Sequence, residues 1–298
     1  MTLLEVSLVL FAASIAAGAL GSVLGLGGGF VIVPVLTLGF HLDIRLAIGT
    51  SIVAVAATSA AGAASNVTES ITNLRVATLL AMATTLGAVT GALMAGVFDA
   101  RFLFALFGVV LGVSSLQMLR RRSIAVAEVP SLVSEQVVLS VGTAALPREA
   151  RNVHLADRLS LHSAYWDETA GCEVPYTVVH TGLGLGLMYL AGTLSGLLGI
   201  GSGALKVPAM DLAMHLPMKV STATSNLLIG LTAAASAVVY FARGDIDPLI
   251  VGPVALGVLL GATHGSKRLV GMRSDRLRTL FVVVIGVVAA QMLWKGLA

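Results

Sequence analysis

The sequence predicts an all-α polytopic membrane protein made of two inverted repeats. Three observations predict this fold: the composition is strongly apolar, one glycine-rich apolar run occurs twice, and the basic residues fall mostly on one side of the predicted spans. The chain has 298 residues, of which 57% are hydrophobic and 11% are charged, with a mean hydropathy of +0.96. Soluble proteins carry about 25% charged residues, so this composition indicates an integral membrane protein.

The repeated glycine-rich run covers residues 25–34 and again residues 199–208. The first copy lies in a stretch, residues 6–40, that contains no charged residue and would overshoot a hydrocarbon core about 30 Å thick as one helix. Clustered glycines and a proline disfavour a helix interior, so each run is predicted to be a helix, a glycine break (re-entrant or hairpin) and a short second helix. Broken helices at membrane depth usually face a protein-enclosed or watery site.

Six further charge-free segments are predicted to be transmembrane helices, because most reach the roughly 17 to 25 residues that a span needs. They are residues 46–68, 76–98, 102–119, 220–242, 248–266 and 279–294. The chain starts with Glu5 and no basic region, so we expect the first run to be a permanent span and not a cleaved signal. The predicted units are the repeat 1–122, a linker 123–177 and the repeat 178–298.

The two halves correspond beyond the broken runs. The matching pairs include His41 with His215, Arg45 with Lys219, Thr50 with Thr224, Ser51 with Ser225, and Thr58 with Thr232. His41 and His215 are expected to be turn or cap residues, with a ligand role the less favoured alternative. Asp43 is expected to be the N-cap of the helix that follows.

The basic residues indicate how the halves are oriented. If each half crosses the membrane an odd number of times, only Arg45, Arg101, Arg243 and Lys295 of the 18 lysines and arginines fall on the outer side, and Lys206 lies within the membrane. Parallel halves would give a nearly even split, so the positive-inside rule favours inverted halves. We expect both termini outside and a multi-pass protein of a prokaryotic inner membrane with a cytoplasmic insert.

That insert, residues 123–177, carries seven acidic residues and cannot span the membrane. Tyr165–Asp167 and residues 173–178 flank a turn at Gly171, which predicts a small β-hairpin. Strand propensity also occurs at residues 137–141. The insert is either a linker between inverted halves or a site of regulation or subunit contact. Small residues elsewhere are predicted to let helices pack closely: Gly87, Gly91, Gly108, Gly112, Gly257 and Gly261.

The candidate substrate-binding residues lie in the broken runs and in the helix after each run. Glycine breaks leave free amides at the start of a half-helix, where the helix dipole favours an anion. The hydroxyls about two turns into the next helix are expected near the midplane, where they contact either a substrate or their own backbone. The set is Gly27, Gly28, Gly29, Thr50, Ser51, Gly201, Ser202, Gly203, Lys206, Thr224, Ser225 and Asn226.

Lys206 is the sharpest of these candidates, because its counterpart in the first repeat is Ile32. An ammonium at membrane depth costs about 2.5 to 3.5 kcal/mol on insertion scales, so it needs a partner. That partner is either Asp211, at a poor helical spacing for an ion pair, or a translocated anion. If the pair forms, Asp211 is a possible carrier of a coupling proton.

Other kinds of site are disfavoured. The glycine runs lack the pattern of a dinucleotide or phosphate loop, and Asp211, His215 and His264 lack metalloenzyme spacing. Cys172 is the single cysteine, so it can form no internal disulfide. The net charge of +3 is explained by basic residues at the ends of spans, so no nucleic-acid partner is expected. We predict no catalytic residue, metal or cofactor; the expected partners are a small anion and the bilayer.

The chain resembles the sulfite exporter TauE/SafE family over both halves. The resemblance rests on Gly27-Gly-Gly-Phe followed by Pro34, on Gly199-Ile-Gly-Ser-Gly203 followed by Pro208, and on the two Thr-Ser pairs. It implies a carrier of small sulfur-containing anions, such as sulfite, thiosulfate, sulfonates or sulfoacetate, bound centrally between inverted repeats. Two features depart from the family pattern: Ser202 replaces a usual glycine, and the acidic insert is longer than in many members.

Three functions remain open from the sequence. The leading hypothesis is a secondary anion transporter. A passive anion channel is the alternative, and saturable, gradient-coupled flux would argue against it. A membrane-embedded enzyme is the less favoured third hypothesis. The sequence leaves the anion, the coupling ion, the direction of transport and the oligomeric state open.

Overall fold

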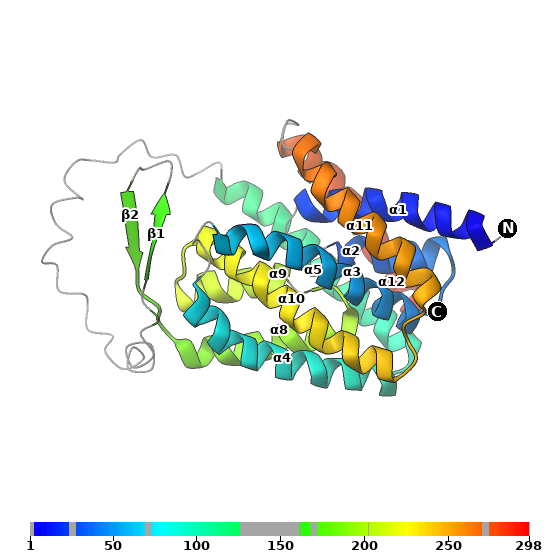
Figure 1. Cartoon of the computed structure of the whole chain (residues 1–298), viewed down its shortest axis with the longest axis horizontal. Helices are drawn as coiled ribbons and strands as arrows, with labels where there is room; N and C mark the ends of the chain where they lie inside the picture. The colour runs from blue at the N-terminus through cyan, green and yellow to red at the C-terminus, as the bar shows by residue number, and fades with distance from the viewer. Residues whose placement is uncertain are drawn as a thin grey trace, which may run out of the picture.

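A computed structural model describes residues 3–23, 28–68, 73–125, 161, 163–167, 172–201, 203–269 and 274–297. The first half contains α1 (Leu3–Val23), α2 (Gly29–Pro34), η1 (Val35–Gly39), α3 (Ile44–Thr68), α4 (Leu74–Val97) and α5 (Ala100–Ala125). The second half contains α8 (Thr181–Leu198), α9 (Gly203–Pro208), η2 (Ala209–Ala213), α10 (Met218–Ala242), α11 (Pro248–Leu269) and α12 (Ser274–Leu297). The fold is therefore that of an all-α membrane protein, with one small hairpin between the halves (Figure 1).

Both glycine-rich runs are broken, and both continue further than the prolines suggested. Pro34 ends α2 and Pro208 ends α9. After each proline the run continues as one π-helical segment, η1 in the first half and η2 in the second. A proline lacks an N–H and clashes with the preceding turn, and the wider π-helical turn is a form in which a helix absorbs such a disruption. Each short helix is thereby extended toward the turn that precedes α3 or α10.

The turns that follow the π-helical segments are alike in the two halves. His41 and His215 both have positive φ, at 53° and 55°, which confirms them as turn residues. Asp43 accepts a hydrogen bond from the Arg45 backbone N–H at 2.8 Å, which confirms its N-cap role. In the second half Pro217 occupies the N-cap position of α10. The next helix therefore starts at a defined place in each half.

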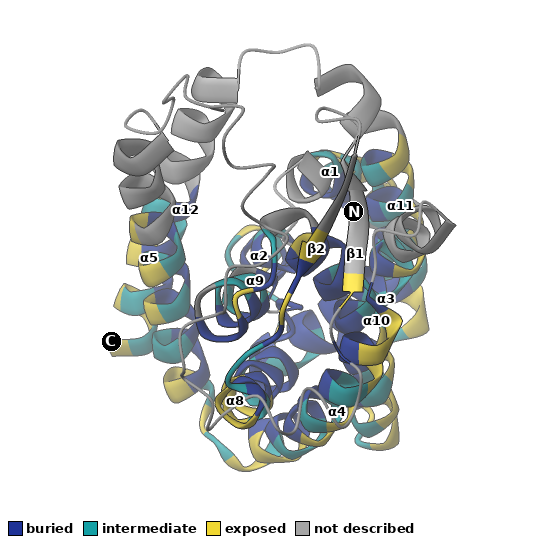
Figure 2. Ribbon diagram, turned by 90° about the vertical axis from the view of Figure 1, so that its left-hand side faces the viewer, coloured by how far each residue is buried: buried dark blue, intermediate teal, exposed yellow. Residues whose placement is uncertain are grey.

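The helices pack in matching pairs. α1 packs against α11 and α4 against α8, while α5 packs against α12 and α3 against α10. Figure 2, which looks along the bundle, shows these pairs around α2 and α9. Close approaches give the directions of the helices. Gly49 contacts Asp245 and Gly230 contacts Ser59, so α3 and α10 are antiparallel. Gly257 contacts Phe11 and Gly261 contacts Ile15, so α1 and α11 are parallel.

Most of the predicted small-residue contacts exist. A Cβ added at Gly87 or Gly91 would collide with α8, one at Gly257 or Gly261 with α1, and one at Gly108 with α12. Gly112 is the exception, because nothing lies within 4 Å of a Cβ built there. Among the described residues the expectation of a close contact at Gly112 was therefore wrong.

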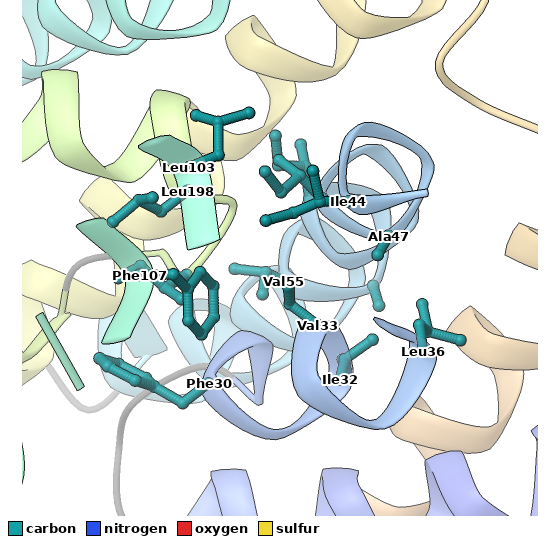
Figure 3. Close-up of a cluster of buried hydrophobic side chains, with 14 of the residues drawn as sticks. Phe30, Ile32, Val33, Leu36, Ile44, Ala47, Val55, Leu103, Phe107 and Leu198 are labelled. Atoms are coloured by element: carbon teal, nitrogen blue, oxygen red, sulfur yellow. The ribbon is translucent and has the colours of Figure 1, made fainter. Parts of the chain in front are cut away.

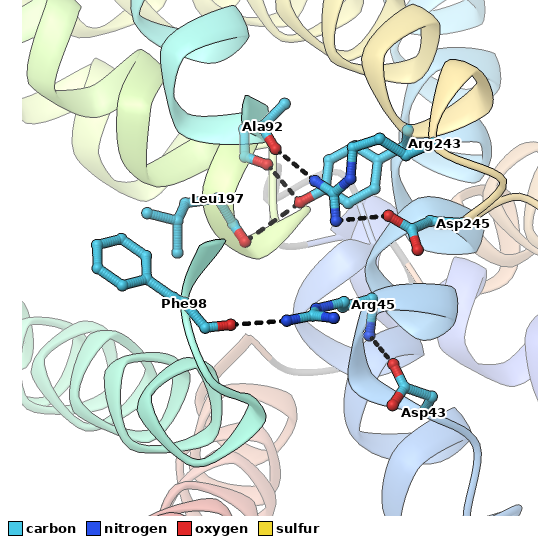
Figure 4. A network of polar contacts seen from close by, with 9 residues as sticks. Asp43, Arg45, Ala92, Phe98, Leu197, Arg243 and Asp245 are labelled. Atoms are coloured by element: carbon cyan, nitrogen blue, oxygen red, sulfur yellow. Dashed lines mark hydrogen bonds and ion pairs between the residues drawn. The ribbon is translucent and has the colours of Figure 1, made fainter. Parts of the chain in front are cut away.

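One end of the bundle gathers basic side chains from both halves, and we call it the Arg45 end. Arg45 donates from Nη2 to the Phe98 carbonyl at 2.9 Å (Figure 4). Arg243 pairs with Asp245 at 2.6 Å and donates to the Ala92 carbonyl at 2.7 Å. The Phe98 carbonyl lies just beyond the C-terminal end of α4, where a helix leaves carbonyl groups without intrahelical partners. Lys295 and Arg101 line one surface groove at this end.

The hairpin lies at the opposite end of the molecule (Figure 1). Strands β1 (Ser163–Asp167) and β2 (Cys172–Tyr176) pair antiparallel, where a hairpin was expected from the sequence. Asn73 anchors its base by donating to the Leu161 carbonyl at 3.0 Å and to the Tyr176 hydroxyl at 2.8 Å. Burial raises the pKa of Tyr176, so its phenol stays neutral. The segment 137–141 lies outside the described residues.

Three helices in the described part of the chain are long and apolar enough to cross a membrane: Leu74–Val97, Thr181–Leu198 and Val220–Ala242. Shorter apolar helices accompany them, among them Ile44–Ala60, Ala100–Leu116 and Pro248–Thr263. The largest buried apolar cluster includes Phe30, Ile32 and Val33 of α2 together with residues of α3 and α5 (Figure 3). The broken run of the first half is therefore in the middle of the protein and not at its surface.

Candidate substrate site

The two glycine breaks meet inside the bundle. Gly28 has a φ of 76° and precedes α2, while Gly199 and Gly201 have φ values of 69° and 71° after α8. A Cβ added at Gly29 would lie 2.6 Å from the Gly199 carbonyl oxygen and 2.9 Å from Ile200 Cα. Only glycine allows this approach, and positive φ likewise favours glycine. Gly28, Gly29, Gly201 and Gly203 are all buried, while Gly27 and Ser202 lie outside the described residues.

Ser51 is hydrogen-bonded at the contact between the two glycine breaks, whereas the other candidate hydroxyls are not. The Ser51 hydroxyl donates to the Gly199 carbonyl at 2.8 Å. The hydroxyls of Thr50, Thr224 and Ser225 are buried and have no hydrogen-bond partner among the described residues. Their side chains are at most 1% exposed. A buried hydroxyl without a partner costs about 1 to 3 kcal/mol, so these three groups are poised to bind something polar.

The two hydroxyl pairs do not lie at one level. Thr50 and Ser51 are in the first two turns of α3, and Thr224 and Ser225 are in the first two turns of α10. Because α3 and α10 are antiparallel, the pairs lie toward opposite ends of the bundle, roughly 20 Å apart at about 1.5 Å per residue. The two pairs therefore do not share one level, and each lies to one side of the middle of the α3–α10 pair.

Lys206 occupies the middle. Its side chain on α9 is 0% exposed. Its Nζ donates to the Thr232 hydroxyl at 2.8 Å and approaches the Leu228 carbonyl at 3.4 Å. Both acceptors are close to Gly230, the residue of α10 that faces Ser59 near the centre of α3. The ammonium is thus between the levels of the two hydroxyl pairs.

No carboxylate among the described residues forms an ion pair with the Lys206 ammonium. Of the two partners that the sequence left open, Asp211 forms no ion pair with Lys206 in the described structure; it lies in η2, five residues further along the chain. Asp211 and Asn226 are both partly buried. A buried cation that has only neutral acceptors retains strong affinity for an anion, since neutral oxygen atoms do not cancel its charge.

Sequence reasoning missed Thr232 as a member of this site. Thr232 donates to the carbonyls of Leu228 at 2.8 Å and Ile229 at 3.0 Å, so its oxygen is free to accept from Lys206. The one available signal was its alignment with Thr58 in the repeat. Thr58 also donates to carbonyls of its own helix, at Ala54 and Val55, but accepts no hydrogen bond from a lysine among the described residues.

The sequence also did not predict the contacts that hold α4, α8 and α10 together at the Arg45 end. Tyr240 donates to the Gly196 carbonyl at 2.9 Å, within the last turn of α8. The Arg243 guanidinium lies 5.2 Å from the Tyr240 ring centroid. Together with the Arg243–Asp245 ion pair, these contacts tie the end of α10 to α4 and α8 (Figure 4).

Comparison with known proteins gives one consistent result. A family model described as sulfite exporter TauE/SafE matches residues 10–292. The chain is 24% identical to the probable membrane transporter protein YunE of Bacillus subtilis, over 97% of this chain and 98% of that protein. It is 26% identical to YdhB of the same organism over 87% of each chain, and 25% identical to a probable membrane transporter protein of Xylella fastidiosa over 94% of each. No solved structure matches.

Proposed function

Because this chain belongs to the sulfite exporter TauE/SafE family and is a membrane transporter, we propose that it carries a small sulfur-containing anion through the centre of its bundle. The candidates are sulfite, thiosulfate, sulfonate or sulfoacetate. The observation that carries the proposal is the fully buried Lys206 ammonium, which has hydroxyl and carbonyl neighbours but no carboxylate among the described residues. An anion is the partner that such a charge requires.

The positions of the polar groups along the bundle suggest the route of the anion. Thr50 and Ser51 lie toward the Arg45 end, Lys206 lies in the middle, and Thr224 and Ser225 lie toward the hairpin end. The buried hydroxyls without partners can donate to an oxyanion as it approaches or leaves the ammonium. The glycine breaks next to Ser51 supply further backbone donors. Asp211, partly buried beside this route, is the candidate for carrying a coupling proton.

We further propose that the two halves are inverted repeats in a prokaryotic inner membrane, with the hairpin insert in the cytoplasm. Antiparallel packing of α3 on α10 supports the inversion, as do the close contacts of Gly108 with Leu293 and of Gly296 with Ala105, which make α5 and α12 antiparallel. The gathering of Arg45, Arg101, Arg243 and Lys295 at one end supports an outer location of that end. The inverted arrangement predicted from the sequence assigns the other lysines and arginines outside the membrane to the opposite side, as the positive-inside rule favours.

The test is transport of labelled sulfite and thiosulfate by the full chain in proteoliposomes. Lys206→Gln is expected to reduce transport at least about a hundredfold, since loss of a charged hydrogen bond of about 3 kcal/mol corresponds to that factor. Lys219→Gln, a lysine at the start of α10, is the matched control and should retain transport. Wild-type rates in Lys206→Gln would remove Lys206 from the site.

The same vesicles separate a carrier from the alternatives. A carrier shows saturable flux that follows an imposed ion gradient, whereas a passive channel shows flux that grows with anion concentration and needs no coupled ion. Conversion of the anion in detergent, with no gradient present, would favour a membrane-embedded enzyme. We expect saturation, coupling and no conversion.

A further inference from the structure

A surface groove opens at the Arg45 end between η1, α5 and α12. Its volume is about 710 Å³, and it is lined by Leu38, Arg101, Gln291, Trp294 and Lys295. One water molecule takes up about 30 Å³ of the liquid, so the groove is far larger than a small oxyanion needs. The groove is also separate from the proposed transport route, which involves none of these five side chains.

The groove holds two cations that no carboxylate neutralises within the described residues. Arg101 is exposed and makes no hydrogen bond or ion pair there. Lys295 donates from Nζ to the Thr37 carbonyl at 3.2 Å and lies 4.8 Å from the Phe104 ring centroid. Both contacts of Lys295 are with neutral groups, so its charge is held in place and remains available to an anion.

The acidic residues at this end are engaged elsewhere. Asp43 accepts from the Arg45 backbone, Asp247 accepts from the Leu249 backbone, and Asp245 pairs with Arg243. Asp99 is exposed and only two residues from Arg101, yet the two side chains form no ion pair. The groove is therefore a local positive site, because none of these carboxylates bonds Arg101 or Lys295 within the described residues.

The surroundings of the groove are apolar and exposed. Trp294 is 78% exposed, Leu297 is 82% exposed and Phe102 is 46% exposed. In a membrane protein such a surface faces lipid, and tryptophan is enriched where the acyl chains meet the headgroups. A positive groove beside such a tryptophan, at the ends of two spans, lies at the depth of the lipid headgroups.

We propose that this groove binds the phosphate headgroup of an anionic phospholipid. The planar guanidinium of Arg101 offers paired donors that match a phosphate, and Lys295 supplies the second charge. The acyl chains lie along the exposed apolar side chains of α5 and α12. An anionic lipid is favoured over a zwitterionic one, because only the anionic headgroup leaves a net negative charge to meet the two cations.

The first experiment compares lipid retention by the full chain in native mass spectrometry, with phosphatidylglycerol and phosphatidylcholine as probes. Arg101→Gln should lower phosphatidylglycerol affinity about fivefold, the factor that corresponds to one cation near a lipid surface. Adding Lys295→Gln should bring the loss to about tenfold or more. Arg101 has no partner in the described structure, so its replacement leaves the fold intact. Arg75→Gln is the control for general charge attraction, because Arg75 is also an exposed arginine and lies in the first turn of α4, at the hairpin end of the molecule.

The second experiment locates the lipid. The chain has two tryptophans, and Trp166→Phe leaves Trp294 as the single fluorophore. Phosphatidylglycerol with brominated acyl chains should quench Trp294 strongly, and Arg101→Gln should weaken the quenching. Glycerol phosphate, inorganic phosphate and sulfite are added separately as soluble competitors, and none should relieve the quenching at concentrations comparable to the lipid.

Three outcomes would overturn the proposal. Equal retention of phosphatidylcholine would show that charge plays no part. Equal losses in Arg101→Gln and Arg75→Gln would show only general attraction between a basic protein and acidic lipid. Relief of quenching by a soluble anion would assign the groove to that anion instead of a lipid.

Discussion

The two halves of the chain carry different side chains at one equivalent position in the middle of the bundle. In the second half Lys206 is fully buried and bonds Thr232. In the first half Ile32 is 1% exposed within the main apolar cluster, and the equivalent Thr58 bonds only its own helix. The same local fold therefore accepts an aliphatic side chain. The fold of the first half thus needs no charge at this position, and an ionisable residue at membrane depth indicates a functional site.

Removing this difference between the halves is expected to have the largest effect. Lys206→Ile copies the first half, and it should abolish transport, at least about a hundredfold, because the anion loses its only buried cation in the described site. The thermal unfolding temperature should stay level or rise, since Thr232 already donates to the Leu228 carbonyl and is not left unpaired.

The matched control changes the same position of the first half. Ile32→Val should retain transport and lower the free energy of unfolding by about 1 kcal/mol, the usual result of deleting one buried methylene. Proteoliposome flux and thermal unfolding in detergent measure the two effects. A loss of transport in Ile32→Val equal to that in Lys206→Ile would contradict the functional difference between the halves.

The contact between the two breaks offers a stability test. Gly29→Ala should destabilise the protein by about 1 to 3 kcal/mol, because the new methyl group would meet the Gly199 carbonyl, Ile200 and the Ser51 hydroxyl. Gly112→Ala is the control in open space and should raise stability by up to about 1 kcal/mol through helix propensity. Thermal unfolding that ranks the two variants in the reverse order would show that the breaks do not touch.

The smallest expected effect comes from the equivalent threonines. Thr232→Val should reduce transport about fivefold, because Lys206 loses its nearest acceptor at 2.8 Å, worth about 1 kcal/mol. Thr58→Val removes the same hydroxyl from the first half, where it bonds only Ala54 and Val55, and should leave transport unchanged. Transport rates are measured at several sulfite concentrations. Equal losses in both variants would assign the threonines a purely structural role.

Local features of the sequence were enough for much of the fold. The apolar composition and charge-free segments predicted an α-helical membrane protein, and the paired glycines predicted two broken helices. Asp43, His41 and His215 were placed correctly, because N-caps and turns depend on residues within one or two positions. The close packing at Gly87 and Gly261 was also predictable, since small residues in membrane spans let helix backbones approach one another closely.

The arrangement of the candidate site was harder to predict from the sequence than the fold. The repeat made Thr50 and Thr224 equivalent, but equivalence in an antiparallel pair of helices places them at opposite ends and not together. The partner of Lys206 was sought among nearby acids, whereas the actual acceptor is Thr232, on another helix and 26 positions away.

The sequence by itself determined the class of the fold and the positions of the breaks and drew attention to Lys206, because each depends on composition or on neighbours along the chain. Only the tertiary structure decided which hydroxyls remain without partners, that the π-helical segments follow the prolines, and that the ammonium lies between two polar levels. Those features depend on how α3, α9 and α10 pack, and packing joins residues whose separation along the chain carries no signal of their distance in space.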